Sequence, residues 1–345
     1  MLPIAAKTGV HMTVRVGLIG SGVMGAQLAR ILAMDVRDCT LAAIADVDAE
    51  RARRAAAPFD VKRIETDPLA VIRDANVDAV LVASSDDTHF DLVAECIRIG
   101  KPVLCEKPLS LTSVQCRALV DAETKARKRL VQVGFMRRFV PGYAALKEAV
   151  DDRRHGAPVF MHCVHRIATA PHYFKTEVIP FASAVHEFDA ARYVLAEEFV
   201  RLTVRPARAS AKASSRNPLF SLLEAASGAL VDVEIFPDAQ YGYDVRAELV
   251  LETGTLSLAT PTATKIRANA YEGQPIDAGW SRRFALAYQR QASAWIRSIL
   301  TTSSALAASA WDGYVATTLA ELSLKALAEN RDLTLIPERV SPLYL

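Results

Sequence analysis

Two short polar clusters contain residue types that could move a proton beside a reacting carbon atom. The first is Glu106-Lys107-Pro108, which directly follows a short apolar run. A lysine there could hydrogen-bond a reacting oxygen and stabilise developing alkoxide charge, although it could equally be an ordinary surface lysine. The second is the run 185–189, VHEFD, where His186 could accept a hydroxyl proton because imidazole titrates near neutral pH. We therefore take Lys107 and His186 as candidate catalytic residues.

A glycine-rich run near the start of the chain predicts a dinucleotide site. Gly20-Ser21-Gly22-Val23-Met24-Gly25 has the spacing GxGxxG and separates an apolar run from a helical pattern. The first glycine permits a tight turn, the second lets the backbone approach a pyrophosphate, and the third lets helix and strand pack closely. Asp46 ends the next apolar run, where a carboxylate accepts ribose hydroxyls and repels a 2′-phosphate. We predict NAD rather than NADP, with Arg51 as a nearby residue that would favour NADP.

Alternating strand and helix patterns in the first third of the chain must position these residues. Helical patterns are expected at 24–32, 48–57, 68–75 and 88–99, and buried strands at 14–19, 41–45, 77–84, 102–106 and 130–135. This order predicts a parallel sheet covered by helices, with right-handed crossovers. Ligands bind at the carboxyl edge of such a sheet, which is where Asp46 and Lys107 fall.

The pattern changes after Arg138. Apolar and polar residues alternate, most clearly at 231–235, and predict a sheet with one buried and one exposed face. Strands are expected at 159–165, 200–204, 229–235, 247–252 and 255–258, and helices at 143–150, 284–300 and 311–329. The predicted fold class is α/β: an N-terminal Rossmann domain over 1–138, and a C-terminal α+β domain over 139–345 with an open, mainly antiparallel sheet. Residues 1–11 are expected to be a disordered extension or a mis-assigned start.

The composition excludes several classes of protein. The chain has 345 residues, of which 51% are apolar, which suits two domains with sizeable cores. Its 41 basic and 39 acidic residues are spread along the sequence and leave a net charge of +2, which argues against a nucleic-acid or membrane-surface protein. No apolar run approaches the length of a membrane span.

The cysteines and histidines give no sign of a disulfide framework or a metal site. The five cysteines are an odd number without CxxC spacing, so we expect reduced, buried thiols in a cytoplasmic protein. The nearest approach to a metal motif is His162-Cys163-x-His165. Neighbouring residues on a strand point to opposite faces, so we expect no metal there.

An ordered set of motifs resembles the glucose-fructose oxidoreductase/inositol dehydrogenase/MocA (Gfo/Idh/MocA) family, and the inositol 2-dehydrogenases in particular. The motifs are GLIGSGVMG (17–25), SSDDTH (84–89), CEKPLS (105–110), VQVGFMRR (131–138), VHEFD (185–189), QYGYD (240–244) and WSRRF (280–284). They cover nearly the whole chain, and their order makes the resemblance specific.

The resemblance implies a role for each matching position. Lys107 would contact the reacting hydroxyl, and His186 would be the acid/base. The peptide bond between Lys107 and Pro108 is expected to be cis, and the open sheet would join copies into dimers or tetramers. Further cofactor contacts are implied for Ser84, Ser85, His89, Glu106 and Lys107, and substrate contacts for Met136, Arg137 and Tyr241.

Two positions depart from the inositol dehydrogenase pattern. Those enzymes carry an Asp four residues before the histidine, where this chain has Ala182, and an Asn after the His-Arg pair, where it has Ile167. Each change would leave polyol hydroxyls unpaired, at about 1–3 kcal/mol per lost contact. Ser183 could hold the imidazole more weakly in place of the Asp. We therefore expect poor activity on myo-inositol and better activity on a less polar or glycosylated ring.

The best-supported function is an NAD-dependent dehydrogenase that oxidises a secondary hydroxyl of a cyclitol, sugar or glycoside. One alternative is an NAD-dependent glycosidase or lyase that acts through transient oxidation of a sugar and re-uses the NADH. Another is a non-catalytic NAD-binding protein. Lys107 and His186 argue against a non-catalytic role.

Overall fold

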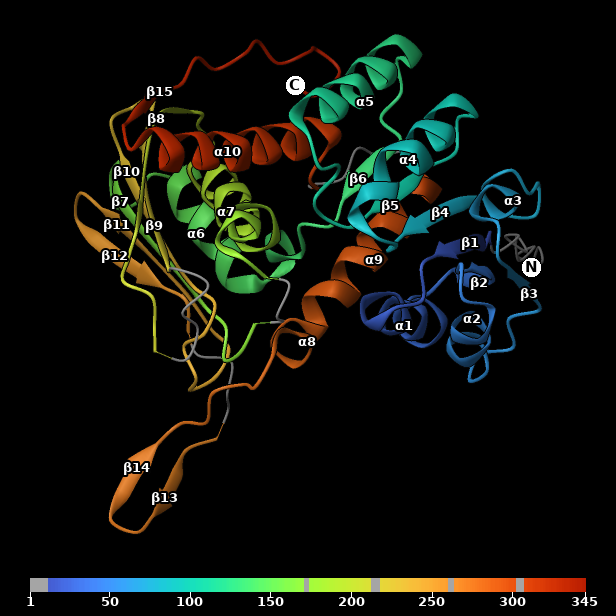
Figure 1. Ribbon diagram of the computed structural model, residues 1–345, viewed down its shortest axis with the longest axis horizontal. Coiled ribbons are helices and arrows are strands. Elements are labelled where there is room, and N and C mark those ends of the chain that lie inside the picture. Colours follow the sequence, from blue (N-terminus) through green and yellow to red (C-terminus); the bar gives the residue numbers. More distant parts are fainter. Residues whose placement is uncertain (1–11, 171–173, 212–217, 260–263, 302–306) are drawn as a thin grey trace, which may run out of the picture.

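The computed structural model describes residues 12–170, 174–211, 218–259, 264–301 and 307–345, and the expected extension at 1–11 lies outside them. Two sheets form two lobes (Figure 1). The N-terminal sheet has six parallel strands in the order β3-β2-β1-β4-β5-β6, as in a Rossmann fold. They are β1 (Val14–Ile19), β2 (Cys39–Ala45), β3 (Arg63–Glu65), β4 (Ala79–Val82), β5 (Val103–Cys105) and β6 (Val131–Val133).

Helices cover this parallel sheet, which explains why its central strands are apolar throughout. Side-chain caps begin several of them: Asp48 accepts from the backbone N–H groups of Glu50 and Arg51, Asp67 accepts from that of Leu69, and Thr112 accepts from that of Gln115. The helices are α1 (Val23–Arg30), extended by a π-helical turn (Ile31–Asp35), α2 (Ala49–Ala56), α3 (Pro68–Ile72), α4 (His89–Arg98) and α5 (Ser113–Ala126), with a 3₁₀ turn at Asp86–Thr88.

The second sheet has seven strands in the order β12-β11-β7-β10-β9-β8-β15, and its pairs are antiparallel except β7 with β10. The expected alternation is present in β10, where Val231, Val233 and Ile235 are buried. The strands are β7 (Pro158–Arg166), β8 (Phe199–Pro206), β9 (Leu219–Ala225), β10 (Leu230–Phe236), β11 (Asp244–Leu251), β12 (Gly254–Ser257) and β15 (Leu333–Thr334).

The two long C-terminal helices return to the N-terminal lobe. Tyr288 and Trp295 pack into the same apolar cluster as Leu18 of β1, and Gly313 lies against Leu109 and Val133. The Rossmann sheet is therefore covered partly by residues from the far end of the chain (Figure 1). The helices that follow β6 are α6 (Pro141–Asp151), α7 (Val185–Leu195), α8 (Trp280–Arg283), α9 (Ala285–Thr301) and α10 (Ala310–Glu329), with short turns at Met136–Phe139 and Thr176–Val178 (3₁₀) and at Pro180–Ala184 (π).

Three further features complete the fold. A small hairpin of β13 (Ile266–Ala268) and β14 (Tyr271–Gly273) projects away from both lobes (Figure 1). The cysteines are free thiols, four of them buried and Cys39 half-buried. In the part of the chain that the structure describes, no helix combines the length and apolarity needed to cross a membrane.

Candidate active site

A cavity of about 610 Å³ lies at the carboxyl edge of the parallel sheet. Its walls come from the glycine turn, from the residues after β2 and β4, and from the first turns of α3 and α4. It is lined by seven of the residues expected to bind the cofactor, Gly20, Gly22, Val23, Met24, Asp46, Ser84 and Ser85. The structure adds Asp67, Pro68 and Leu69, which are not among the predicted site residues although they follow the third strand at the same edge.

The glycine turn has the shape that a pyrophosphate requires. Gly20 has φ +88°, and a Cβ there would lie 2.4 Å from the Ala83 carbonyl oxygen. A Cβ on Gly25 would lie 2.0 Å from the Gly20 oxygen, so only glycine lets α1 pack this close to the turn. At Gly22 a Cβ would meet nothing within 4 Å, and no side chain caps α1 there. The first N–H groups of α1 are thus available to phosphate oxygens, and this turn fits a dinucleotide.

Asp46 is held as a charged carboxylate on the wall of this cavity. One oxygen accepts from the Ser21 backbone N–H and hydroxyl, both at 2.7 Å, and the other from the Asp48 backbone N–H at 2.9 Å. Arg51 donates to both oxygens, at 3.0 and 2.6 Å. Burial raises the pKa of Asp46, but the hydrogen bonds, led by Arg51, outweigh it and leave the pKa below its usual range. A ribose hydroxyl would therefore meet an ionised acceptor and share it with Arg51.

Asp46→Ser should weaken NAD binding by about 10- to 100-fold, because hydrogen bonds to a charged group contribute about 1.5–3 kcal/mol. The affinity gap between NAD and NADP should narrow at the same time, because the repulsion of a 2′-phosphate is lost. Fluorescence titration with each cofactor measures both effects. Asp60→Ser, at a highly exposed carboxylate, is the control and should change neither. Equal wild-type affinity for NAD and NADP would contradict the role of Asp46.

Lys107 begins the turn that follows β5 at the same sheet edge. Its peptide bond with Pro108 is cis, as expected. The half-buried side chain crosses to the second lobe, where Nζ donates to the Ala182 carbonyl oxygen at 3.2 Å. His89 contacts this turn: its side chain is fully buried, and its Nδ1 donates to the Pro108 carbonyl oxygen at 2.7 Å. His89 thus braces the lysine turn, and its direct contact with the cofactor stays a prediction.

Glu106, the residue before Lys107, is buried against Gly134. A Cβ on Gly134 would lie 2.9 Å from the carboxyl group, so a glycine is needed here. Burial raises the pKa of Glu106 to about 7, while the charge of Lys107 acts in the opposite direction. Burial thus disfavours the charged form of this carboxyl group, which lies directly beside the candidate catalytic lysine in the chain.

His186 lies in the first turn of α7, directly after the π-helical turn at Pro180–Ala184. It is 7% exposed, and the Phe135 ring meets it edge-on with centroids 6.0 Å apart. Its buried Nδ1 has no hydrogen-bond partner among the described residues. Burial, and then the positive charges of Lys107 and Arg137, hold the pKa of His186 well below its ordinary value. The imidazole is therefore neutral and able to accept a proton.

A buried ion pair lies next to His186. Arg137 and Glu187, 1% and 0% exposed, form it across the two lobes. His165 Nδ1 lies 3.1 Å from Glu187 Oε1 and 3.2 Å from Arg137 Nη2, and its Nε2 lies 3.1 Å from the Tyr243 hydroxyl. Burial alone would lower the pKa of Arg137 and raise that of Glu187, but their mutual attraction reverses both shifts. Arg137 is a predicted substrate contact, and its ion pair with Glu187 has no counterpart among the sequence predictions.

The remaining expected substrate residues differ in their surroundings. Ala182 and Ile167 pack against the apolar core of the second lobe, while Met136 and Ser183 are each 1% exposed. Tyr241 is 47% exposed, and its hydroxyl donates to Asp244 at 2.6 Å and accepts from Arg166 at 3.0 Å. Lys107 thus contacts Ala182, one helical turn before His186. A contact between Tyr241 and substrate stays a prediction.

The chain matches known proteins over most of its length. Residues 14–135 match the oxidoreductase family with an NAD-binding Rossmann fold (GFO_IDH_MocA), and residues 143–257 match the GFO/IDH/MocA C-terminal domain. Inositol 2-dehydrogenase 1 of Saccharopolyspora erythraea is 49% identical over 91% of this chain and 94% of its own length. The inositol 2-dehydrogenase of Klebsiella pneumoniae is 38% identical, again over 91% and 94%.

A solved structure extends the likeness to three dimensions. The myo-inositol dehydrogenase of Lactobacillus casei, in complex with NAD(H) and myo-inositol, superposes with a TM-score of 0.93 at 28% identity. The superposition covers 97% of this chain and 100% of the other. The order and packing of both lobes are therefore shared with an enzyme crystallised with its cofactor and a cyclitol.

Proposed function

The chain belongs to the Gfo/Idh/MocA family of NAD-dependent oxidoreductases acting on CH–OH groups, and we propose that its substrate is a cyclitol with one oxidisable secondary hydroxyl. The observation that carries the proposal is the contact of Lys107 Nζ with the Ala182 carbonyl, one turn before His186. This contact supports the proposal because it brings the Lys107 side chain of the cofactor-binding lobe to within one helical turn of His186. Such a pair suits the removal of a hydroxyl proton.

Bound NAD supplies the hydride acceptor, and the side chains of this protein handle the oxygen and the proton. We infer that Lys107 donates a hydrogen bond to the reacting oxygen and stabilises negative charge that develops on it. The neutral imidazole of His186 accepts the hydroxyl proton. The apolar walls formed by Phe135 and the core around Ala182 exclude water, which strengthens both interactions.

A substrate panel read by NADH absorbance between pH 7 and 9 tests this function. Inositol isomers and their methylated or glycosylated derivatives should give NADH that accumulates with product. A glycosidase or lyase that re-uses its NADH would release product without accumulation, and a non-catalytic protein would give neither. Lys107→Ala serves as the negative control.

The residues at 167 and 182 should set the preference among cyclitols. We expect wild type to be poor on myo-inositol, because Ala182 and Ile167 offer no polar group to its hydroxyls. Ala182→Asp with Ile167→Asn should raise kcat/KM on myo-inositol by about 2- to 10-fold for each contact regained, since a hydrogen bond contributes about 0.5–1.5 kcal/mol. The two are combined because neighbouring pocket residues couple. Efficient wild-type turnover of myo-inositol would show that both positions are tolerated variation.

A matched control separates the polar groups from the change in volume. The control is Ala182→Leu with Ile167→Leu. The first substitution enlarges the side chain and the second changes only its shape, and neither adds a hydrogen-bonding group. This pair should leave the activity on myo-inositol at or below that of wild type. An equal gain in the apolar and the polar pair would assign the effect to pocket shape instead.

The acid limb of the pH profile should report the low pKa of His186. Its neutral form accepts the proton, and the pKa lies well below 6.5 because of burial and the charges of Lys107, Arg137 and His165. Oxidation should therefore stay level as the pH falls through 6.5 and decline only at lower pH. Ala182→Asp should raise the pKa and move the decline to higher pH. If the wild-type kcat/KM instead declines with a midpoint at pH 6.5 or above, the low pKa of His186 is contradicted.

We further propose a cytoplasmic homo-oligomer, a dimer or tetramer that forms through the outer face of the second sheet. Two large apolar side chains on this face are exposed: Phe160 (40%) and Phe220 (44%). Large apolar side chains exposed on a sheet face are typical of protein–protein contacts.

A further inference from the structure

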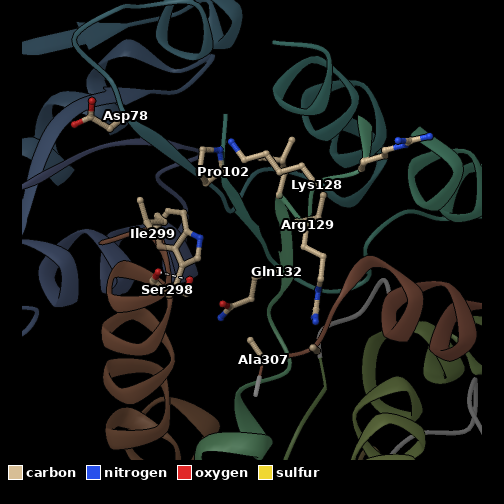
Figure 2. Close-up of a pocket in the computed structure, with 13 residues that line it drawn as sticks. Asp78, Pro102, Lys128, Arg129, Gln132, Ser298, Ile299 and Ala307 are labelled. Atoms are coloured by element: carbon tan, nitrogen blue, oxygen red, sulfur yellow. Dashed lines mark hydrogen bonds between the residues drawn. The ribbon is translucent and has the colours of Figure 1, made fainter. Parts of the chain in front are cut away.

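A second cavity, of about 590 Å³, lies at the opposite edge of the parallel sheet from the cofactor cavity (Figure 2). Asp78 precedes β4, Pro102 precedes β5 and Leu130 precedes β6, so these residues mark the amino edge of the sheet. The other wall is the last part of α9, with Trp295, Ser298 and Ile299. No lining residue is shared with the cofactor cavity.

The rim of this second cavity is basic. Arg127, Lys128 and Arg129 follow α5 in succession and all line it. Among the described residues none of them forms a salt bridge, and Arg129 lies over the Tyr344 ring at 5.9 Å. Asp78, the acidic residue of the wall, is already occupied by Arg15, whose Nε and Nη2 donate to it at 2.9 and 2.8 Å. The positive charge of this rim makes the cavity attractive to an anion.

A buried donor in the wall lacks a partner. Gln132 is 6% exposed, and its Nε2 has no hydrogen-bond partner among the described residues. Its carboxamide points into the space between Ser298 and Arg129 (Figure 2). An unmade hydrogen bond at a buried group costs about 1–3 kcal/mol, which an acceptor oxygen in the cavity would recover.

The remaining wall is apolar. Trp295 is 2% exposed, and Leu130, Ile299 and Ala307 line the cavity around it. We propose that the cavity binds a small organic anion, a carboxylate or phosphate carried on a ring or other apolar body. The anionic group would lie near the Gln132 amide within the positive field of Lys128 and Arg129, and the apolar body would lie against Ile299 and Trp295. This site is separate from those for cofactor and substrate.

Phenyl phosphate is a suitable probe, because it joins a ring to an anion. Isothermal titration of the NAD-saturated protein keeps its phosphate away from the cofactor cavity. Phenyl phosphate should bind at least 10-fold more tightly than inorganic phosphate, which lacks the ring, or benzyl alcohol, which lacks the charge. Phenylacetate in a parallel titration distinguishes a carboxylate-selective from a phosphate-selective site.

Variants locate the binding. Lys128→Ala with Arg129→Ala should weaken phenyl phosphate by at least 10-fold, and Gln132→Leu, which removes the amide at similar size, by several-fold. The matched control is Arg290→Ala with Lys325→Ala, which removes two exposed cations from α9 and α10 away from the cavity and should change nothing. NAD affinity, measured alongside, should stay at the wild-type value in all three.

Two results would overturn the proposal. The first is that phenyl phosphate fails to bind the wild type, or binds the wild type and every variant with the same affinity. The second is absent binding together with a change of molecular mass in the Lys128 and Arg129 variant, which light scattering would show. That outcome would assign the basic rim to contact between copies of the chain. Because the two cations are on the surface, their variant is expected to fold.

Discussion

Replacing Lys107 or His186 by alanine should lower kcat by about 10²–10⁴, the range for losing a positioned electrostatic or acid/base group. The Lys107 side chain reaches from the cofactor-binding lobe to the Ala182 carbonyl, and the buried, neutral His186 lies one turn further along. Neither side chain lines the cavity that holds Asp46. NAD affinity should therefore be largely kept in both variants, while turnover falls.

Controls distinguish this catalytic effect from a general loss of charge or of an imidazole. Lys62→Ala and His162→Ala remove exposed side chains of the same types outside the candidate site and should leave kcat near wild type. The decisive measurement is kcat beside the dissociation constant for NAD in each variant. If either Lys107→Ala or His186→Ala keeps near-wild-type turnover, the residue has no catalytic role.

Glu187→Ala should reduce the free energy of unfolding by about 3–5 kcal/mol. Arg137 and Glu187 are both fully enclosed, and removing the carboxylate leaves the guanidinium buried without its charge partner. His165 and Tyr143 also contact this pair, so its loss should loosen the junction between the two lobes. Urea denaturation followed by circular dichroism measures the change.

A paired replacement tests whether the unpaired charge is the cause. Arg137→Met with Glu187→Leu removes both charges and should recover most of the stability, because apolar residues of similar size often replace a buried ion pair at little cost. Lys147→Ala breaks an exposed helical pair with Asp151 and should cost less than about 1 kcal/mol. A loss as small as this in Glu187→Ala would contradict the importance of the buried pair.

Local patterns in the sequence were sufficient for most elements of the fold. The apolar runs predicted five of the six Rossmann strands within a few residues, and the alternation at 231–235 predicted β10. Other elements were missed because their patterns are ambiguous. Strand β9, with the sequence LFSLLEA, has helix-forming leucines and alanine, and only pairing with β8 and β10 makes it extended. Strand β3 has three residues, too few to show a period.

In the candidate site, too, the features set by local sequence were predictable and those set by contacts between distant residues were not. The glycine turn and Asp46 could be placed from the sequence, because their roles depend on short-range geometry within one strand–turn–helix unit. The partner of Arg137 could not, because Glu187 belongs to a different lobe. The lining residues Asp67 to Leu69 follow a strand too short to be recognised, so their approach to the cofactor cavity had no signal.

The sequence by itself determined the type of each lobe and the dinucleotide turn, because residue spacing sets backbone periodicity and local turn geometry. The choice of Lys107 and His186 came from the resemblance of their motifs to a known family, and their catalytic roles stay predictions. Tertiary structure alone decided which of these groups meet. The Lys107–Ala182 contact and the approach of Gln291 to the Val133 carbonyl both join residues far apart in the chain. Such contacts depend on how whole lobes pack, and so do the burial that keeps His186 neutral and the burial that encloses the Arg137–Glu187 pair. Desolvation and charge pairing act through space, and no local pattern specifies them.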